Sequence, residues 1–222
     1  MNLALFDLDN TLLAGDSDVE WPRFLIGKGL LDAEYYHREN DRFYQQYRDG
    51  TLDIDAFLDF QLKPLADRDR DELDALHAEY LDVHIKPIIT RLGRERVAAH
   101  QAQGDLVVIV TATNRFITEP IARELGVEHL IATELEQGAD GRFTGRPSGT
   151  PSFKDGKITR LDEWLAARGS RLDAFDSSWF YSDSRNDIPL MSRVSHPVAV
   201  DPDDFLRAHA EAHDWPVISL RD

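Results

Sequence analysis

Residues 3–11 read Leu-Ala-Leu-Phe-Asp-Leu-Asp-Asn-Thr, and this stretch decides how the rest of the chain is interpreted. The apolar run predicts a buried strand over residues 3–8, with Asp7 and Asp9 at its end. Because alternate residues of an extended chain point to one side, both carboxylates are expected to project together. A buried carboxylate is costly unless it is paired or bound to a metal, and open α/β sheets bind ligands at the carboxyl ends of their strands. The stretch therefore predicts magnesium-dependent chemistry on a phosphate group.

Composition limits the classes of partner. The chain has 222 residues, which suits one α/β domain with an insertion or two small domains. Its formal net charge of −16 disfavours nucleic acid and anionic membrane surfaces as partners. A small phosphorylated substrate remains compatible, because one metal ion and one lysine create a local positive site. The absence of cysteine excludes disulfides and thiolate metal sites.

Neither end of the chain nor its interior suggests export. The N-terminus lacks a basic region, and Asp7 interrupts its apolar run, so no signal peptide is expected. No apolar run approaches the ~18 residues that span a bilayer. These features predict a cytoplasmic protein without a membrane partner, and they carry no signal for oligomeric state.

Residues 16–88 have a helical character throughout. Apolar and aromatic residues recur at helical spacing, and Gly29, Gly50 and Pro64 interrupt the pattern. The segment predicts a bundle of about four helices without a strand. A further helix is expected over residues 88–102.

From residue 104 onward the pattern changes to alternating strands and helices. Strands are expected at 106–110, 129–132, 179–181, 197–200 and 217–218, and helices near 115–125, 157–168, 186–193 and 203–213. A glycine-containing hairpin or flap is expected over residues 134–149. This alternation predicts an α/β fold with a doubly wound, parallel, Rossmann-like sheet. We therefore predict a core domain of residues 1–15 and 89–222, with residues 16–88 inserted as a helical-bundle cap.

Thr111-Ala112-Thr113-Asn114 follows the most apolar predicted strand. A hydroxyl at Thr111 could hold a phosphate oxygen, aided by backbone N–H groups that open the next helix. The alternative is a plain helix cap, since Thr and Asn are good capping residues. Both interpretations can hold together.

Lys157 is expected to begin a helix, where a cation opposes the helix dipole. The conflict suggests that this lysine neutralises a phosphate or a nucleophile. The alternatives are an ordinary surface lysine and a role for Lys154 instead. We favour Lys157 because the amphipathic pattern begins there.

A second pair of acids, Asp183 and Asp187, follows the strand predicted at 179–181. Their spacing places them on one face of a helical turn. Mg²⁺ takes oxygen ligands from one or two carboxylates, water and substrate. A helix cap with a solvated acid is the alternative, and it is disfavoured because two acid pairs follow two strands of one sheet.

With these motifs in order, the chain resembles the haloacid dehalogenase-like hydrolase superfamily over essentially its whole length. The family's four motifs are matched by Asp7-x-Asp9-x-Thr11, Thr111, Lys157, and Asp183 with Asp187. Ser182 stands where the fourth motif often has glycine. The helical insertion resembles the cap of the phosphoserine-phosphatase-like branch. The residues in and next to the motifs are most similar to those of a subgroup that includes histidinol-phosphate phosphatases.

The resemblance implies a phosphomonoester hydrolase acting on a small phosphorylated metabolite. Asp7 would be the nucleophile that forms an aspartyl-phosphate, and Asp9 the general acid and then base. Mg²⁺ would be held by Asp7, the backbone carbonyl of Asp9 and Asp183, with Asp187 in or next to the shell. Thr111 and Lys157 would stabilise charge on the transferring oxygens.

Substrate contacts are expected from the phosphate side and from the cap. The predicted substrate-binding residues are Asp16, Thr111, Ala112, Asn114 and Lys157. By resemblance, Asp16 could pair with a substrate ammonium group; its alternative role is to cap the helix that begins near Asp18.

Histidinol phosphate is the favoured substrate, because it is cationic and would suit an acidic, aromatic cap. Such a cap would draw on Asp16, Asp18, Glu20, Trp21 and several tyrosines. Phosphoserine is the alternative, and its carboxylate would need a cation from among Arg23, Arg38, Arg42 and Arg48. A dehalogenase would not need Asp9. A phosphomutase would keep both acids, and a non-catalytic binding protein would more plausibly have lost one.

Overall fold

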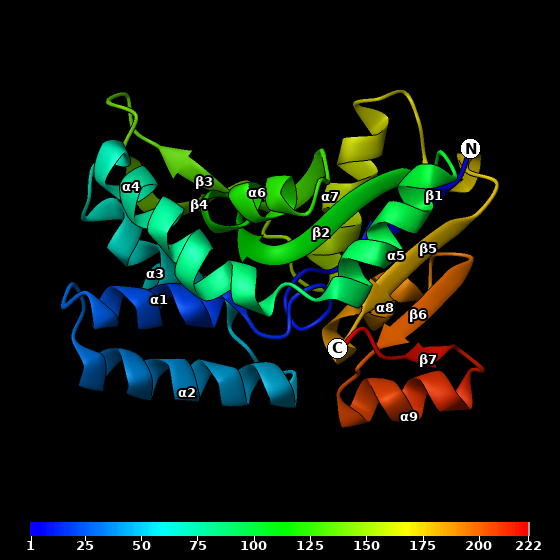
Figure 1. Ribbon diagram of the computed structural model, residues 1–222, viewed down its shortest axis with the longest axis horizontal. Helices are drawn as coiled ribbons and strands as arrows, with labels where there is room; N and C mark the ends of the chain where they lie inside the picture. The colour runs from blue at the N-terminus through cyan, green and yellow to red at the C-terminus, as the bar shows by residue number, and fades with distance from the viewer. Residues whose placement is uncertain (222) are drawn as a thin grey trace.

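The computed structural model describes residues 1–221, which form a seven-stranded sheet in the order β4-β3-β2-β1-β5-β6-β7 (Figure 1). Its strands are β1 (Leu3–Phe6), β2 (Leu106–Asn114), β3 (His129–Gln137), β4 (Phe143–Ser148), β5 (Ser178–Ser182), β6 (His196–Val200) and β7 (Val217–Ile218). All neighbouring pairs are parallel except β3 and β4. The predicted Rossmann-like α/β fold is confirmed.

Each face of the sheet is covered by its own helices. Alternation along β1 sends Ala4 and Phe6 to one apolar cluster and Leu3 and Leu5 to another. The first cluster includes side chains from α5 (Arg91–Ala102) and α6 (Arg115–Glu124). The second includes side chains from α7 (Asp155–Ala166), α8 (Ile188–Met191) and α9 (Asp204–Ala212). Because both faces are buried, β1 and β2 read as continuous apolar runs.

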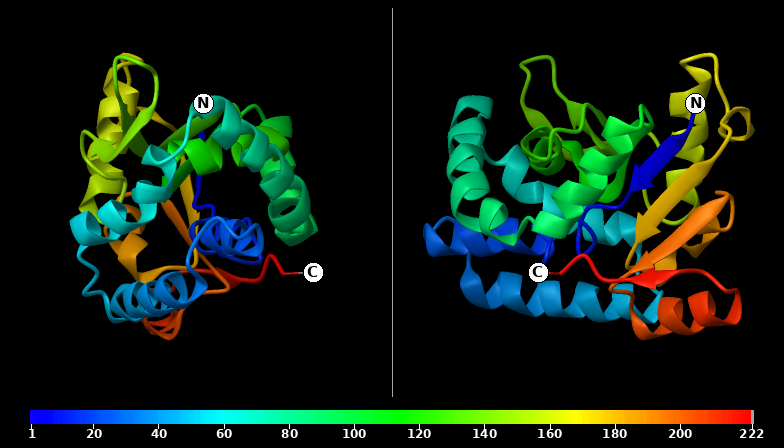
Figure 2. Two further views of the ribbon diagram at one scale, coloured as in Figure 1. Left: turned by 90° about the vertical axis from the view of Figure 1, so that its left-hand side faces the viewer. Right: turned by 45° about the vertical axis from the view of Figure 1, so that its right-hand side comes forward.

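Residues 16–88 form the helical insertion. It contains α1 (Ser17–Gly27), α2 (Ala33–Asp49), α3 (Ile54–Ala66) and α4 (Arg70–Tyr80), then a π-helical turn (Leu81–Ile85) and a 3₁₀ turn (Lys86–Ile88). As predicted, there are four α-helices and no strand among residues 16–88. Figure 2 shows these helices gathered at one end of the sheet.

Aspartates begin all four of these helices. The side chains of Asp16, Asp32, Asp53 and Asp69 each accept hydrogen bonds from backbone N–H groups in the first helical turn. Such caps satisfy donors that have no partner inside the helix. Part of the acidic composition is therefore local structure.

The insertion leaves and rejoins the sheet domain at one place. Leu13 and Ile89 form an isolated antiparallel bridge. The amide of Ala14 donates to the carbonyl of Ile88 at 2.6 Å, and that of Thr90 to the carbonyl of Leu12 at 3.1 Å. The two connections thus run side by side.

Among the boundaries that differ from the predictions, two lie next to the cavity. Strand β2 continues through Asn114, with a register shift between Val110 and Asn114, so Thr111 does not end it. The continuation arises because Asn114 pairs with Thr133 of β3, a partner distant in sequence. Helix α7 begins at Asp155, two residues before Lys157.

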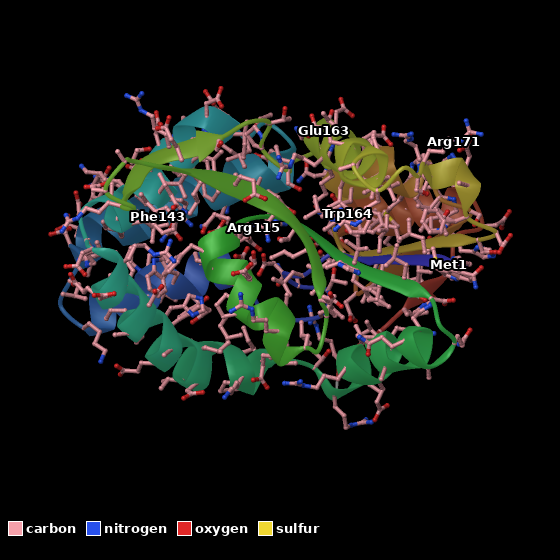
Figure 3. The ribbon with its side chains drawn as sticks, turned by 90° about the horizontal axis from the view of Figure 1, so that it is seen from above. Met1, Arg115, Phe143, Glu163, Trp164 and Arg171 are labelled. Carbon is pink, nitrogen blue, oxygen red and sulfur yellow. The ribbon has the colours of Figure 1, made fainter. Side chains whose placement is uncertain are left out.

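The expected hairpin over 134–149 is confirmed as the antiparallel pair of β3 and β4. It packs against the insertion: a Cβ at Gly145 would lie 3.1 Å from the Ala66 Cβ, and the positive φ of 80° also favours glycine there. Phe143, labelled with Arg115 in Figure 3, stacks edge-on against Phe116 of α6 at 5.5 Å between ring centroids. The hairpin therefore joins the helical insertion to the sheet.

Candidate active site

Asp7 lies where β1 ends, and Lys157 reaches it from the first turn of α7. The Lys157 Nζ donates to Asp7 Oδ1 at 2.8 Å and to Asp187 Oδ2 at 2.7 Å. All three side chains are buried. Residues 150 positions apart in the chain thus form one ion-paired group.

Burial dominates the electrostatics of this group. It raises the pKa of Asp7 to about 7, opposed by the cation of Lys157 and reinforced by Asp187. Burial would lower the pKa of Lys157, but the two carboxylates together hold it above its usual value. Lys157 is therefore a permanent positive charge beside Asp7.

Asp9 has different partners. Its Oδ1 accepts from the backbone N–H of Ser17 at 2.6 Å, and its Oδ2 accepts from the Thr113 hydroxyl at 2.8 Å. Burial raises the pKa of Asp9, and the hydrogen bonds from Ser17 and Thr113 oppose that shift. A carboxyl group with a raised pKa is suited to donating a proton.

Asp183 is positioned by Thr11, the last residue of the opening motif. The Thr11 hydroxyl donates to Asp183 Oδ1 at 3.2 Å and accepts from the Asp183 backbone N–H at 3.1 Å. Ser182, at the position where glycine is common, donates its hydroxyl to Asp187 Oδ2 at 2.7 Å. Burial raises the pKa of Asp183, and the charges of Asp7 and Asp187 raise it further.

The carboxylates fit a hard divalent cation. The negative charges of Asp7 and Asp187 destabilise the charged form of Asp183. Lys157 donates hydrogen bonds to Asp7 and Asp187 and none to Asp183. Among residues 1–221 no three His, Asp or Glu side chains form a ready-made metal cage. Mg²⁺ does not require one, because it takes one or two carboxylates and fills its shell with water, carbonyls and substrate. A cation beside Asp7 and Asp183 would offset their repulsion.

The residues of the second motif, Thr111 to Asn114, do not all face the cavity. Thr111 and Ala112 line the central cavity. The Thr111 oxygen accepts from the backbone N–H of Thr113 at 3.2 Å. Asn114 does not line the cavity, because its side chain caps α6 by accepting from the Ile117 N–H at 3.2 Å. For Asn114 the structure shows the capping role.

Lys154 and Lys157 also have different positions. Lys154 precedes α7 with a positive φ of 50°, and its Nζ donates to the carbonyl of Gly50 at 2.8 Å. It contacts the end of α2 and lies apart from Asp7. The structure thus places Lys157 in the site and Lys154 at the edge of the helical insertion.

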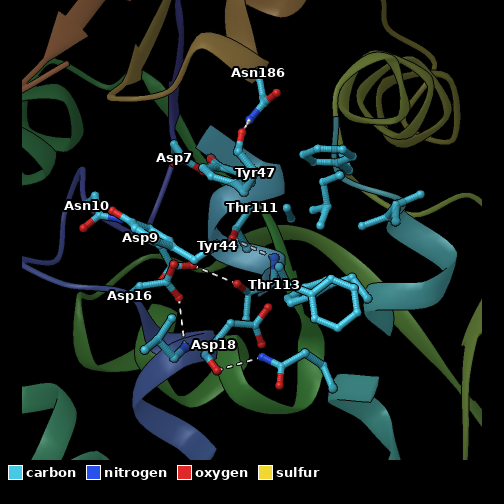
Figure 4. Close-up of a pocket in the computed structure, with 18 of the residues that line it drawn as sticks. Asp7, Asp9, Asn10, Asp16, Asp18, Tyr44, Tyr47, Thr111, Thr113 and Asn186 are labelled. Carbon is cyan, nitrogen blue, oxygen red and sulfur yellow. Dashed lines mark hydrogen bonds between the residues drawn. The ribbon is translucent and has the colours of Figure 1, made fainter. Parts of the chain in front are cut away.

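A cavity, lined by Asp7, Asp9 and Asp187 but not by Asp183, joins this site to the insertion (Figure 4). From the sheet domain and the segment leading into α1 it is lined by Asp7, Asp9, Asn10, Asp16, Thr111, Ala112, Thr113, Phe153, Lys157, Asn186 and Asp187. From the insertion helices and the turn before α3 it is lined by Asp18, Val19, Asn40, Phe43, Tyr44, Tyr47, Leu52, Ile54, Phe57 and Gln61. Lys157 is the one lysine or arginine among these residues. The outer part is thus mainly aromatic and apolar, with the carboxyl group of Asp18 as its one acid.

Two residues expected in the cap do not line this cavity. Glu20 pairs with Arg23 and His84, and Trp21 is buried against Phe24 and Tyr80. Helical rotation explains this result, because these residues lie on other faces of α1 from Asp18.

The four arginines considered as carboxylate partners also do not line the cavity. Arg23 pairs with Glu20, while Arg38 and Arg42 pair with Glu39. Side-chain direction on a helix decides these outcomes, and residue type alone does not reveal it.

Asp16 caps a helix and also has a place in the cavity lining. It caps α1 by accepting from the Val19 N–H at 3.1 Å, and it also lines the cavity. Burial raises its pKa to about 7, with Asp9 contributing. The structure brings Asp16 to the same cavity as Asp7 and Asp9.

A family model for haloacid dehalogenase-like hydrolases matches residues 4–192. The chain belongs to this family. Among the relatives of this hydrolase, a histidinol-phosphatase of Neisseria meningitidis serogroup C is 49% identical over 220 residues. The aligned region covers 99% of this chain and 99% of the relative. A phosphoserine phosphatase of Mycobacterium tuberculosis is 32% identical over 98% of this chain and 70% of its own. Family and relatives together identify the chain as a phosphatase.

Two solved structures support the fold of this hydrolase. One, of a protein with unknown function from Bordetella pertussis Tohama I, is 47% identical with a TM-score of 0.93, covering 99% of this chain and 98% of its own. A phosphoserine phosphatase holding a phospho-aspartyl intermediate analogue has a TM-score of 0.69 at 19% identity, covering 99% and 93%. The second similarity concerns the fold alone.

Proposed function

We propose that this phosphatase hydrolyses the phosphomonoester of a cationic amino alcohol, and that histidinol phosphate is its substrate. The observation that carries the proposal is the cavity, which holds the carboxyl groups of Asp16 and Asp18 and connects the Asp7–Lys157 pair to a mainly aromatic and apolar outer part. A leaving alcohol with a positive nitrogen and a flat ring matches such a lining. The name of the Neisseria relative supports the same substrate.

The proposed chemistry gives the two acids separate roles. The Asp7 carboxylate attacks phosphorus, the bond from phosphorus to the ester oxygen breaks, and an aspartyl-phosphate forms. Asp9 gives its proton to the leaving alkoxide. Asp9 then takes a proton from water as that water attacks phosphorus, which releases phosphate and restores Asp7.

The other residues hold charge and position. Lys157 and the Thr111 hydroxyl would donate to the phosphoryl oxygens. Mg²⁺, held by Asp7, Asp183 and the backbone carbonyl of Asp9, would offset the repulsion between the nucleophile and the phosphate dianion. Asp187 keeps Lys157 in place through the 2.7 Å contact.

Phosphoserine is the second candidate because a 32% identical relative is named as its phosphatase. Its substrate carries a carboxylate, which requires a cation beyond the phosphate site. Among residues 1–221 the cavity offers only Lys157, which already contacts Asp7 and Asp187. The lining therefore favours the amino alcohol over the amino acid.

The test is phosphate release from histidinol phosphate, phosphoserine, sugar phosphates, nucleotides and p-nitrophenyl phosphate, with Mg²⁺ and with EDTA. We expect the highest kcat/KM for histidinol phosphate, activity that depends on Mg²⁺, and a loss in Asp7→Asn of about 10³-fold or more. Asp59→Asn, at an exposed position of α3 outside the cavity, is the matched control. No release from any ester would contradict the proposal and favour a phosphomutase.

A further inference from the structure

Asp18 is a buried carboxyl group that the proposed chemistry does not use. It lines the cavity, its exposure is only 9%, and its Oδ1 has no hydrogen-bond partner. Burial raises its pKa, and the charges of Asp16 and Asp9 add to the shift. A polar atom buried without a partner is unfavourable in the free protein.

The residues around Asp18 do not supply the hydrogen bond that its Oδ1 atom lacks. The Thr113 hydroxyl lies nearby, but it has one hydrogen, which it donates to Asp9 at 2.8 Å. The Gln61 side chain donates to the backbone carbonyl of Asp18 at 2.8 Å, which fixes the main chain and leaves the carboxyl free. Figure 4 shows Asp9, Asp16, Asp18 and Thr113 together at this end of the cavity.

Helix stabilisation does not explain the position either. Asp18 lies in the first turn of α1, where an acid interacts favourably with the helix dipole. That interaction also operates from an exposed position, and Asp16 already caps this helix. The burial of Asp18 inside the cavity is therefore an additional feature that suits a ligand.

We propose that the Asp18 carboxyl accepts a hydrogen bond from a nitrogen N–H of the leaving alcohol and so selects nitrogen-bearing cationic esters. The inference rests on the proposed function and adds a selectivity residue to it. Asp18 belongs to α1 of the insertion, whereas Asp7 and Asp9 follow β1, so we assign its contact to the part of the substrate that leaves. Phosphate binding by Lys157 and alcohol binding by Asp18 would then hold the substrate at both ends.

The experiment compares histidinol phosphate with p-nitrophenyl phosphate in wild type, Asp18→Asn and the control Asp59→Asn. We expect Asp18→Asn to reduce the ratio of the two kcat/KM values by about 10- to 100-fold, mainly through KM for histidinol phosphate. Free histidinol, which has no phosphate, should inhibit wild type and inhibit Asp18→Asn more weakly. The control should match wild type in both assays.

Thermal unfolding separates selectivity from folding. Because Asp18→Asn removes an unpartnered buried acid, its midpoint without substrate should equal or exceed that of wild type. A midpoint several degrees lower would overturn the inference, since it would make Asp18 a structural residue. An unchanged selectivity ratio would overturn it while leaving the proposed function intact. A wild type without preference for histidinol phosphate would overturn both.

Discussion

At the scale of single residues, each carboxylate of the site differs in its partners. Asp7 contacts a lysine, Asp9 a hydroxyl and an amide N–H, and Asp183 the hydroxyl of Thr11. Lys157 places a positive charge beside Asp7, whereas Asp9 accepts from neutral donors and has a raised pKa. These different environments suit identical side chains to the different steps proposed for them.

Replacing Lys157 by Met should reduce kcat by about 10²-fold or more, because the cation beside Asp7 is lost. The variant should also unfold at a lower temperature, since Asp7 and Asp187 would stay buried without their partner. Steady-state kinetics and thermal unfolding test both statements. Lys154→Met is the matched control and should keep kcat within a few-fold of wild type. Equal losses in the two variants would contradict the assignment of Lys157.

The acids were predictable because two of them directly follow a strand and two follow another. Thr113 was not assigned a contact, although it lies two residues from Thr111 in a strand and alternation would have paired them. The contact of Asp9 with the Ser17 N–H could not be predicted, because it depends on where the chain turns into α1. The burial of Asp18 depends on how the insertion packs, which residue type does not encode.

At the scale of elements, the C-terminal turn of α2 is one of the places where the insertion meets the sheet domain. The carbonyl of Gly50 accepts from Lys154 at 2.8 Å, and the carbonyl of Tyr47 accepts from Asn186 at 3.5 Å. The last carbonyls of a helix lack partners within it, so donors from outside stabilise that end. The Tyr47 hydroxyl extends the contact by donating to Ser184 Oγ at 2.7 Å.

Replacing Tyr47 by Phe should lower kcat/KM by about 3- to 10-fold, because one hydrogen bond between the insertion and the sheet domain is lost. The midpoint of thermal unfolding should change little, since the ring is retained. Tyr35→Phe, at an exposed position outside the cavity, serves as the control. A Tyr47→Phe enzyme with wild-type kcat/KM would show that this contact does not contribute.

Elements with clear periodicity were predictable, including both central strands and the four helices of the insertion. Boundaries set by distant partners were not. Strand β2 runs past Thr111 because of its pairing with β3, and α7 begins early in a turn built around the positive φ of Lys154. In both places the backbone near the cavity departs from the local pattern.

At the scale of the whole molecule, the protein buries several acids whose pKa values lie above their usual range. Burial raises those of Asp7 and Asp16 to about 7, against 3.8 for an unperturbed Asp. Between these pH values the folded chain binds more protons than the unfolded chain. The free energy of unfolding should therefore fall as pH rises through this window. His77 and His209 act in the opposite direction below their usual pKa of 6.5, because burial lowers the pKa of each, but the carboxyl groups with a raised pKa outnumber them.

In EDTA, the midpoint of thermal unfolding should therefore be higher at pH 5 than at pH 8, by about 3 °C or more. Mg²⁺ should narrow the difference by stabilising the protein at pH 8, because it binds ionised carboxylates. Calorimetry at both pH values, with and without Mg²⁺, measures this effect. A midpoint that rises from pH 5 to pH 8 in EDTA would show that the buried acids do not control stability.

No helix among residues 1–221 has the length and apolar character to cross a membrane. The overall charge of −16 would repel a phosphate ester at long range. Lys157, buried at the end of the cavity, provides the local attraction that the protein surface does not.

The bridge between Leu13 and Ile89 has a consequence for how such enzymes diversify. Because the chain departs and returns through adjacent backbone positions, an inserted module of another size or sequence would leave the register of β1 and β2 unaltered. Under the proposed function, the residues assigned to the phosphate and the residue assigned to the alcohol, Asp18, would then be encoded in separate stretches of the gene. Natural selection could exchange one specificity for another at this junction without rebuilding the catalytic machinery.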